Sequence, residues 1–345
     1  MDLSIIVPVY NVEKYVRPCL DSIFKQGLDE DRFEVIIVND GSTDKSMEMI
    51  TDIIQQHNNI TIINQENQSL SVARNNGIAV AKGKYILMPD SDDLLIENSL
   101  LPLLDKAIET KADLVVADFL AIRDDEIDSF KEVTQNEFIC QEKTGEQLYL
   151  EDLDQSQCYV WRTLYKREFI LDHHITFVPG INYQDIPFTQ ECYLKAQKCI
   201  KANRLLYIYR TNRPGAATTY FHVQKARSFI IALANTRKLT QLSLSTQVRY
   251  KLEENIYSAF RTIIYHTTYR IHKSSERRHI ITMLNDEVPH LCFTHGIKQK
   301  VTTFMLQHFP NIYIELYYYY VQVVHRKVLT RTIFHKDNEG QMPIK

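Results

Sequence analysis

Short apolar runs alternate with stretches of helical periodicity along the first 120 residues, and this alternation limits the possible fold more than any other feature. The helical stretches cover about residues 13–26, 42–57, 70–81 and 97–110. The apolar runs are residues 3–9, 33–38, 60–63, 84–88 and 113–117. Continuous apolar strands joined by helices are typical of βαβ units, whose parallel sheet is buried on both faces. The pattern predicts an α/β fold with a doubly wound, mostly parallel sheet.

The residues that directly follow the apolar runs are the candidate ligand-binding residues. Crossovers in such sheets are right-handed, and ligands bind beyond the carboxyl ends of the strands. Residues 8–11, 39–42 and 89–93 occupy these positions and are rich in polar side chains.

Glycine is too scarce for the common nucleotide-binding loops. Nine of the 345 residues are glycine, less than half the usual share of about 7%. They form neither a GxGxxG nor a GxxxxGK[ST] sequence, which excludes the dinucleotide-binding loop and the P-loop. Any nucleotide must be held by other groups.

The charge is divided unequally along the chain. Residues 1–200 carry 18 Lys and Arg against 35 Asp and Glu, whereas residues 201–345 carry 22 against 8. After about residue 221 the strand patterns fade, and residues 224–240 and 246–268 have amphipathic helical patterns. We expect a first domain over residues 1–220 and a basic helical region over residues 221–345, which meets an anionic partner.

Several other classes of protein are disfavoured. The six cysteines form no CxxC and the 12 histidines no HExxH, so a zinc site is not expected. The run at residues 3–9 is too short for a signal-peptide core, and no stretch reaches the ~18 apolar residues of a membrane helix. We expect a cytoplasmic protein with reduced thiols. No nucleic-acid-binding motif accompanies the basic charge.

Asp90-Ser91-Asp92-Asp93 is the strongest local signal. In extended backbone Asp90 and Asp92 would point to one side and Asp93 to the other. Mg²⁺ takes one or two carboxylates and completes its shell with water and phosphate oxygens, so the cluster suits a metal-bound diphosphate. A solvated turn before a helix would have the same composition, and the context decides between the two.

Two further residues are predicted to face the same edge of the sheet. Asp40 can accept an N–H from a nucleotide base, while Ser42 or Thr43 can cap the following helix. Arg74, within the predicted helix, can bind phosphate as a bidentate donor or pair with the acidic cluster.

Four segments together resemble the motifs of family 2 glycosyltransferases. They are IIVPVYN at residues 5–11, VNDGSTD at 38–44, ARNNG at 73–77 with GKY at 83–85, and DSDD at 90–93. The resemblance continues through residues 161–165 and 183–188 to about residue 209. It implies the GT-A fold and an inverting enzyme that uses a nucleotide sugar, with UDP as the expected nucleoside diphosphate.

The resemblance also implies roles for the residues that match. Pro8 and Tyr10 correspond to the edge of the base pocket, and Asp40 to the residue that reads uracil. Asp92 and Asp93 correspond to the ligands of a Mn²⁺ or Mg²⁺ ion, and Asp185 to the catalytic base. The nucleotide-sugar-binding residues expected from the motifs and from their chemistry are Pro8, Tyr10, Asp40, Arg74, Asp90 and Asp92.

Two positions depart from the family pattern. Ser69 stands where a Gly usually precedes the helix, which alters the loop beside the diphosphate. Gln184 stands where a Glu usually precedes the base. Loss of that charge should make Asp185 easier to ionise, because a like charge raises a carboxyl pKa. Gln184 also bears on how an acceptor hydroxyl is held.

Some aromatic residues allow two interpretations. Trp161, the only Trp, and Tyr165 are either core residues or contacts for an acceptor sugar. Residues 317–320 are four tyrosines close to Arg326 and Lys327. They either pack in the core or lie at a membrane interface.

Together these features predict a hexosyltransferase-type enzyme, dependent on Mn²⁺ or Mg²⁺, in surface polysaccharide synthesis. Its acceptor is a glycan or a lipid-linked oligosaccharide. A catalytically impaired glycan- or nucleotide-binding module and a nucleotidyltransferase remain as alternatives. The basic region is expected to pair in part with the acidic half and to contact an anionic membrane peripherally, at its cytoplasmic face.

Overall fold

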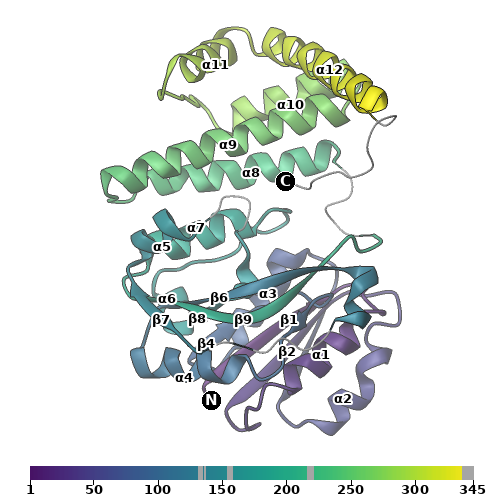
Figure 1. Cartoon of the computed structure of the whole chain (residues 1–345), viewed down its shortest axis with the longest axis vertical. Helices are drawn as coiled ribbons and strands as arrows, with labels where there is room; N and C mark the ends of the chain where they lie inside the picture. Colours follow the sequence, from purple (N-terminus) through teal and green to yellow (C-terminus); the bar gives the residue numbers. More distant parts are fainter. Residues whose placement is uncertain (131–134, 136, 154–157, 216–220, 336–345) are drawn as a thin grey trace. The chain divides into compact units, whose positions relative to one another are not determined.

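The computed structural model describes residues 1–130, 135, 137–153, 158–215 and 221–335, with side chains described as far as residue 324. The chain divides into two compact units (Figure 1). The first comprises Met1–Ala217 and Lys238–Lys251, and the second comprises Thr218–Arg237 and Leu252–Lys345.

A nine-stranded sheet is the centre of the described part of the first unit. Neighbouring strands follow the order β3-β2-β1-β4-β8-β6-β9-β5, and β7 also pairs with β9. The strands are β1 (Leu3–Val9), β2 (Phe33–Asp40), β3 (Ile60–Gln65), β4 (Tyr85–Leu87), β5 (Leu94–Leu95), β6 (Leu114–Arg123), β7 (Cys140–Lys143), β8 (Thr163–Lys166) and β9 (Cys199–Thr211).

The α/β fold class is confirmed, and the sheet is more mixed than the apolar runs suggest. Strands β3, β2, β1 and β4 are parallel to one another, and β6 is parallel to β9. Strand β8 lies antiparallel between β4 and β6, and β5 and β7 pair antiparallel with β9. Strands as short as β5, β7 and β8 have too few residues to give a periodic signal.

Helices cover both faces of the parallel part of the sheet. On one face, alternate residues of β1 and β2 share a buried cluster with α1, α2 and α4. On the other face α3 lies against β1 and β2, where a Cβ at Gly77 would come within 2.3 Å of Ile6 Cγ2. The α-helices of this unit are α1 (Val16–Phe24), α2 (Thr51–Gln56), α3 (Leu70–Val80), α4 (Leu100–Thr110), α5 (Gly145–Glu151), α6 (Arg167–Asp172) and α7 (Asp185–Lys195).

One predicted helix is shorter than its sequence pattern. Residues 42–57 contain only a 3₁₀ turn, Glu48–Ile50, and α2. The Asp44 carboxylate accepts hydrogen bonds from the backbone N–H groups of Glu13 and Ser46. Such bonds offer the backbone an alternative to helix. Residues 42–47 therefore form a loop after β2 that is hydrogen-bonded to the segment after β1.

The second unit is helical. It contains most of α8 (Val223–Lys238) and of α9 (Thr246–Arg270), together with α10 (Ser274–Glu287), α11 (Ile297–His308) and α12 (Pro310–His335). Both amphipathic stretches predicted after residue 221 are therefore confirmed as helices. Within the described residues, no helix has the length and hydropathy needed to cross a membrane.

Candidate functional site

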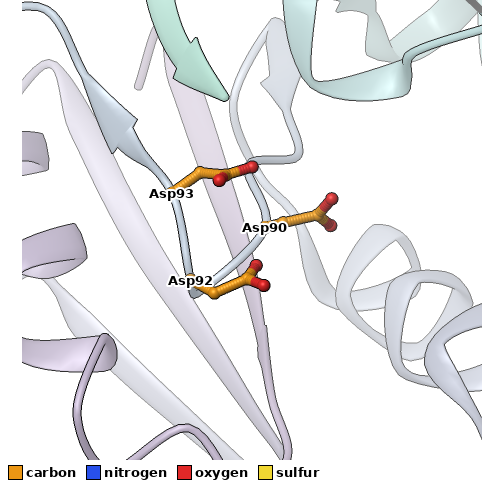
Figure 2. Close-up of side chains that lie close together, drawn as sticks. All are labelled: Asp90, Asp92 and Asp93. Carbon is orange, nitrogen blue, oxygen red and sulfur yellow. The ribbon is translucent and has the colours of Figure 1, made fainter. Parts of the chain in front are cut away.

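Asp90, Asp92 and Asp93 lie on the loop between β4 and β5, and their carboxylates point to the same side (Figure 2). One oxygen atom of each lies within 4.8 Å of the others. The backbone is not extended here, since the Asp93 N–H donates to the Asp90 carbonyl oxygen at 3.2 Å. This turn brings Asp93 to the side of its two neighbours, so the expected split between opposite sides is wrong. Three convergent carboxylates suit a hard divalent cation.

Strand β9 holds Asp93 in place. The Tyr207 hydroxyl donates to Asp93 Oδ2 at 2.9 Å, and the Arg210 N–H donates to Asp93 Oδ1 at 2.7 Å. The same hydroxyl accepts the Asp90 N–H at 3.0 Å, so Tyr207 bridges two members of the cluster. Burial, together with repulsion from Asp92 and Asp90, raises the pKa of Asp93 to about 8. A bound cation would relieve that repulsion.

Arg74 pairs with the acidic cluster. Its Nη2 lies 2.5 Å from Asp90 Oδ1, and its side chain is 2% exposed. Burial raises the pKa of Asp90, and the charge of Arg74 opposes that rise. The structure thus has the ion pair that was one of the two interpretations of Arg74, and a contact with phosphate remains a prediction.

Two arginines at the end of β9 complete the acidic site, and the sequence patterns did not indicate them. Arg213 Nε lies 2.7 Å from Asp92 Oδ2. Arg210 Nε donates to the Asp92 carbonyl oxygen at 2.8 Å. Both guanidinium groups lie over the Tyr15 ring, at 4.8 Å for Arg210 and 5.3 Å for Arg213. The only signal for them was an excess of positive charge that starts near residue 201.

Trp161 and Tyr165 are built into the core. Trp161 is 3% exposed, and its ring stacks on Tyr207 at 4.0 Å and on Tyr159 at 4.6 Å. Tyr165 is fully buried in β8 and donates its hydroxyl to the Val160 carbonyl oxygen. This burial fits the core interpretation of both residues rather than a contact with an acceptor sugar. By stacking on Tyr207, Trp161 supports the side chain whose hydroxyl donates to Asp93.

Asp185 is the first residue of α7 and is partly buried. Burial raises its pKa to about 6, against the opposing charge of Arg74. Asp90 also acts on Asp185 and raises its pKa, so Asp185 lies within electrostatic reach of the acidic cluster. Gln184, before it, is buried, and its Oε1 has no hydrogen-bond partner among the described residues.

Helix α3 connects the acidic cluster to the segment that leads into α7. The Asn75 side chain exchanges two hydrogen bonds with the Phe177 backbone, at 2.9 and 3.0 Å. The Ser71 hydroxyl donates to the Ile181 carbonyl oxygen at 3.2 Å. Arg74 of the same helix lies over the Phe177 ring at 5.4 Å. Helix α3 therefore positions Arg74, which pairs with Asp90, and also the segment that leads to Asp185.

Asp40 is buried at the end of β2 and organises the neighbouring loop. Its carboxylate accepts from Gln65 Nε2 at 2.7 Å and from the backbone N–H groups of Gln68 and Ser69 at 2.8 and 3.1 Å. Ser69 has φ = 92°, a conformation that costs energy for any residue except Gly. This strain explains physically why a Gly would suit the position.

The ends of β1 and β2 are linked beside Asp40. Pro8 is buried in β1 opposite Val38, beyond the last residue of β1 that pairs with β4. Tyr10 follows the strand and is 48% exposed. Asn11 accepts the Thr43 N–H at 2.9 Å. The structure brings Pro8, Tyr10 and Asp40 to one edge of the sheet, as the order of the motifs predicts.

Comparison with known proteins agrees with the motifs. The profile described as "Glycosyl transferase family 2" matches residues 4–169. Glycosyltransferase GlyG of Streptococcus pneumoniae is 31% identical over 240 residues, covering 66% of this chain and 77% of that protein. An uncharacterized glycosyltransferase of Bacillus subtilis, EpsJ, is 34% identical over 212 residues. That match covers 61% of each protein, so the chain spans less than two thirds of EpsJ.

A third relative and a solved structure extend the comparison. The poly(ribitol-phosphate) beta-glucosyltransferase of Bacillus spizizenii is 30% identical over 218 residues, covering 62% of this chain and 33% of that protein. TarS of S. aureus, residues 1–349 in complex with UDP, matches with a TM-score of 0.68 at 18% identity, covering 95% of this chain and 92% of that chain. The complex with UDP-GlcNAc gives a TM-score of 0.67 at 20% identity over the same shares of both chains. The likeness to TarS shows a shared fold, GT-A.

Proposed function

The chain belongs to glycosyltransferase family 2, and from this premise we propose that it moves a sugar from a nucleoside diphosphate sugar to a hydroxyl of a glycan acceptor, with inversion at the anomeric carbon. One observation carries the proposal. Three carboxylates converge, and one of them, Asp90, acts electrostatically on a fourth, Asp185, whose pKa is raised to about 6.

The acidic cluster is the proposed diphosphate side of the site. Asp92 and Asp93 would hold a Mn²⁺ or Mg²⁺ ion, with Asp90 beside them. When bound, the ion would neutralise the charge that develops on the departing nucleoside diphosphate. The donor set supports this assignment, because it consists of hard oxygen ligands whose mutual repulsion is only partly offset by arginines.

Asp185 is the proposed base. Its carboxylate takes the proton of the acceptor hydroxyl while that oxygen attacks the anomeric carbon from the face opposite the diphosphate. The bond from that carbon to the diphosphate oxygen breaks, and the configuration inverts. A carboxyl with a pKa of about 6 is mostly ionised at pH 7 and still has a useful affinity for a proton.

UDP is the proposed nucleoside diphosphate. The TarS complexes with UDP and UDP-GlcNAc support it by fold. Asp40 supports it by position. Among the described residues only Ser69 donates to Asp40 Oδ2, and this oxygen can accept a base N–H as well. Pro8 and Tyr10 are proposed to border the base, and Arg74 to act on the diphosphate through Asp90.

The proposed acceptor is a glycan or a lipid-linked oligosaccharide of surface polysaccharide synthesis. A relative named as a poly(ribitol-phosphate) beta-glucosyltransferase supports a polymeric acceptor. Trp161 and Tyr165 already have partners in the core, so Gln184 is the proposed residue on the acceptor side. Its Oε1, which has no hydrogen-bond partner within the described part of the chain, can accept a hydrogen bond from an acceptor hydroxyl.

Thermal-shift measurements with UDP-, GDP- and dTDP-sugars, with and without Mn²⁺, test the donor. A donor that binds the native state raises the unfolding midpoint by mass action, and we expect the largest rise for a UDP sugar with Mn²⁺. The anomeric configuration of the product, read by NMR, tests inversion. Absence of any donor-dependent shift under both conditions would contradict the proposal.

A catalytically impaired binding module is the second candidate, and Gln184 in place of an acidic residue favours it. Such a module would bind the donor and show neither hydrolysis nor transfer in the presence of Mn²⁺ or Mg²⁺. Family membership leaves the nucleotidyltransferase alternative without support.

A further inference from the structure

Helices α11 and α12 of the second unit each expose an apolar face. Six residues define this surface, which we call the α11–α12 face: Ile297, Val301, Phe304, Ile312, Leu316 and Tyr320. Each of these side chains is more than half exposed, from 54% for Phe304 and Ile312 to 82% for Ile297. Exposed apolar groups gathered on one surface, unlike single ones, mark interaction sites.

The six positions follow the helical repeat. On α11 they are spaced by four and three residues, and on α12 by four and four, so each set lies on one side of its helix. The opposite sides face the core of the unit, where Leu306 of α11 and Ile314 of α12 are 2% and 0% exposed. Each helix therefore has an inner apolar side that is already covered and an outer apolar side that faces solvent.

The two exposed sides meet where α11 ends and α12 begins. Helices α11 and α12 contact each other and are joined through Phe309, and the Phe304 and Phe309 rings lie 6.0 Å apart. Figure 1 shows the two helices one after the other above α9 and α10. The two exposed sides thus approach each other at the Phe304–Phe309 contact.

The exposed charges on α11 have one sign. The exposed lysines Lys298 and Lys300 lie on α11, and α11 has no acidic residue. The one acidic residue of α12, Glu315, pairs with Arg277 at 2.5 Å. Residues 201–345 as a whole carry 22 Lys and Arg against 8 Asp and Glu. Such a surface repels a second copy of itself and attracts an anionic one.

We propose that the α11–α12 face binds the surface of an anionic lipid bilayer. The two helices lie in the plane of the interface, the six apolar side chains enter the boundary between headgroups and acyl chains, and the lysines meet anionic headgroups. This deepens the proposed function by naming the surface at which the enzyme would meet a lipid-linked acceptor. The binding requires neither donor nor metal, so its failure and that of the transferase proposal are distinguishable.

Co-sedimentation of the full chain with vesicles, without nucleotide sugar or metal, tests the proposal. Vesicles of phosphatidylcholine with about one third phosphatidylglycerol should bind at least about tenfold more protein than neutral ones, since each nearby Lys contributes about a factor of five. Leu316→Glu and Phe304→Glu should each reduce the partition coefficient by roughly tenfold or more. Ile139→Glu, at a position 53% exposed in the first unit, is the matched control and should bind as the wild type does.

Three results would overturn the proposal: equal binding to anionic and neutral vesicles, unchanged binding by both α11–α12 variants, or equal loss in the Ile139→Glu control. Light scattering coupled to size-exclusion chromatography tests the other possible partner of this face, a second copy of the chain. If the wild type is a dimer that Leu316→Glu converts to a monomer, and it does not bind vesicles, the face joins two copies of the chain. Far-UV circular dichroism and the unfolding midpoint of each variant establish that the helices are folded.

Discussion

Substitution of Asp185 by Asn is expected to make the protein more stable and the enzyme slower. Burial raises the pKa of Asp185 from its ordinary value of 3.8 to about 6. Because one pKa unit corresponds to about 1.36 kcal/mol, the ionised carboxylate costs the folded state up to about 3 kcal/mol. Asn has nearly the same size and no charge, so the variant avoids this cost.

The size of this effect on the free energy of unfolding depends on pH. A carboxyl whose folded pKa is raised favours folding below its unfolded pKa, and this contribution is lost as pH rises through the folded pKa. The advantage of Asp185→Asn should therefore be under about 1 kcal/mol at pH 4 and reach about 3 kcal/mol by pH 8. At pH 8 this corresponds to an increase of roughly 6–12 °C in the unfolding midpoint.

The same substitution should lower turnover by about 10²–10⁴, the usual contribution of a general base, with donor affinity unchanged. In the wild type, turnover should fall as pH drops below about 6, because the base becomes protonated. Calorimetry at pH 4 and pH 8, together with a transfer assay at saturating donor, measures both effects.

Glu191 provides the matched control on the same helix. It is partly exposed and pairs with Lys195 at 2.6 Å, so Glu191→Gln should change stability by less than about 1 kcal/mol and leave turnover intact. Near-normal transfer by Asp185→Asn, combined with an inactive Glu191→Gln, would refute the assignment and move the base to Glu191. An unchanged midpoint at pH 8 would refute the argument from burial.

Four further substitutions test other parts of the site. Asp93→Ala, and to a similar degree Asp92→Ala, should remove most divalent-dependent donor binding in titration calorimetry, and unchanged affinity in both would rule out the metal site. Tyr207→Phe should weaken Mn²⁺ binding by about tenfold, because Asp93 loses a hydrogen bond, while the stack on Trp161 and its fluorescence persist. Ser69→Gly should raise the free energy of unfolding by about 1 kcal/mol, as relief of the positive φ outweighs the hydrogen bond that Ser69 Oγ accepts from the Gly180 N–H. A less stable Ser69→Gly protein would show that this bond dominates.

Among the site residues, the order of motifs along the chain was enough to place Asp40 and the acidic cluster. Both follow buried parallel strands, and the carboxyl ends of such strands meet at one edge of a sheet by topology alone. The positions of Pro8 and Tyr10 follow for the same reason. The sequence also predicted α8 and α9, because their apolar positions repeat with the helical period.

Contacts between segments far apart in the sequence could not be read from it. Tyr207, Arg210 and Arg213 reach the acidic cluster because β9 pairs with β5, the two-residue strand that directly follows the cluster. Neither so short a pairing nor its register has a local signature. The burial of Trp161 and Tyr165 depends in the same way on the insertion of β8 between β4 and β6.

The sequence by itself determined the chemistry at the edge of the sheet, because side-chain type and strand order are local properties that the chain carries along its length. Only the tertiary structure decided the pKa values and the ion pairs of these side chains. The raised pKa values of Asp93 and Asp185 arise from burial and from charges distant in sequence. The pairing of Arg74 with Asp90, and the outward direction of the apolar faces of α11 and α12, likewise depend on which elements pack together. Desolvation and Coulomb interaction depend on distance in space, which the folded chain alone fixes.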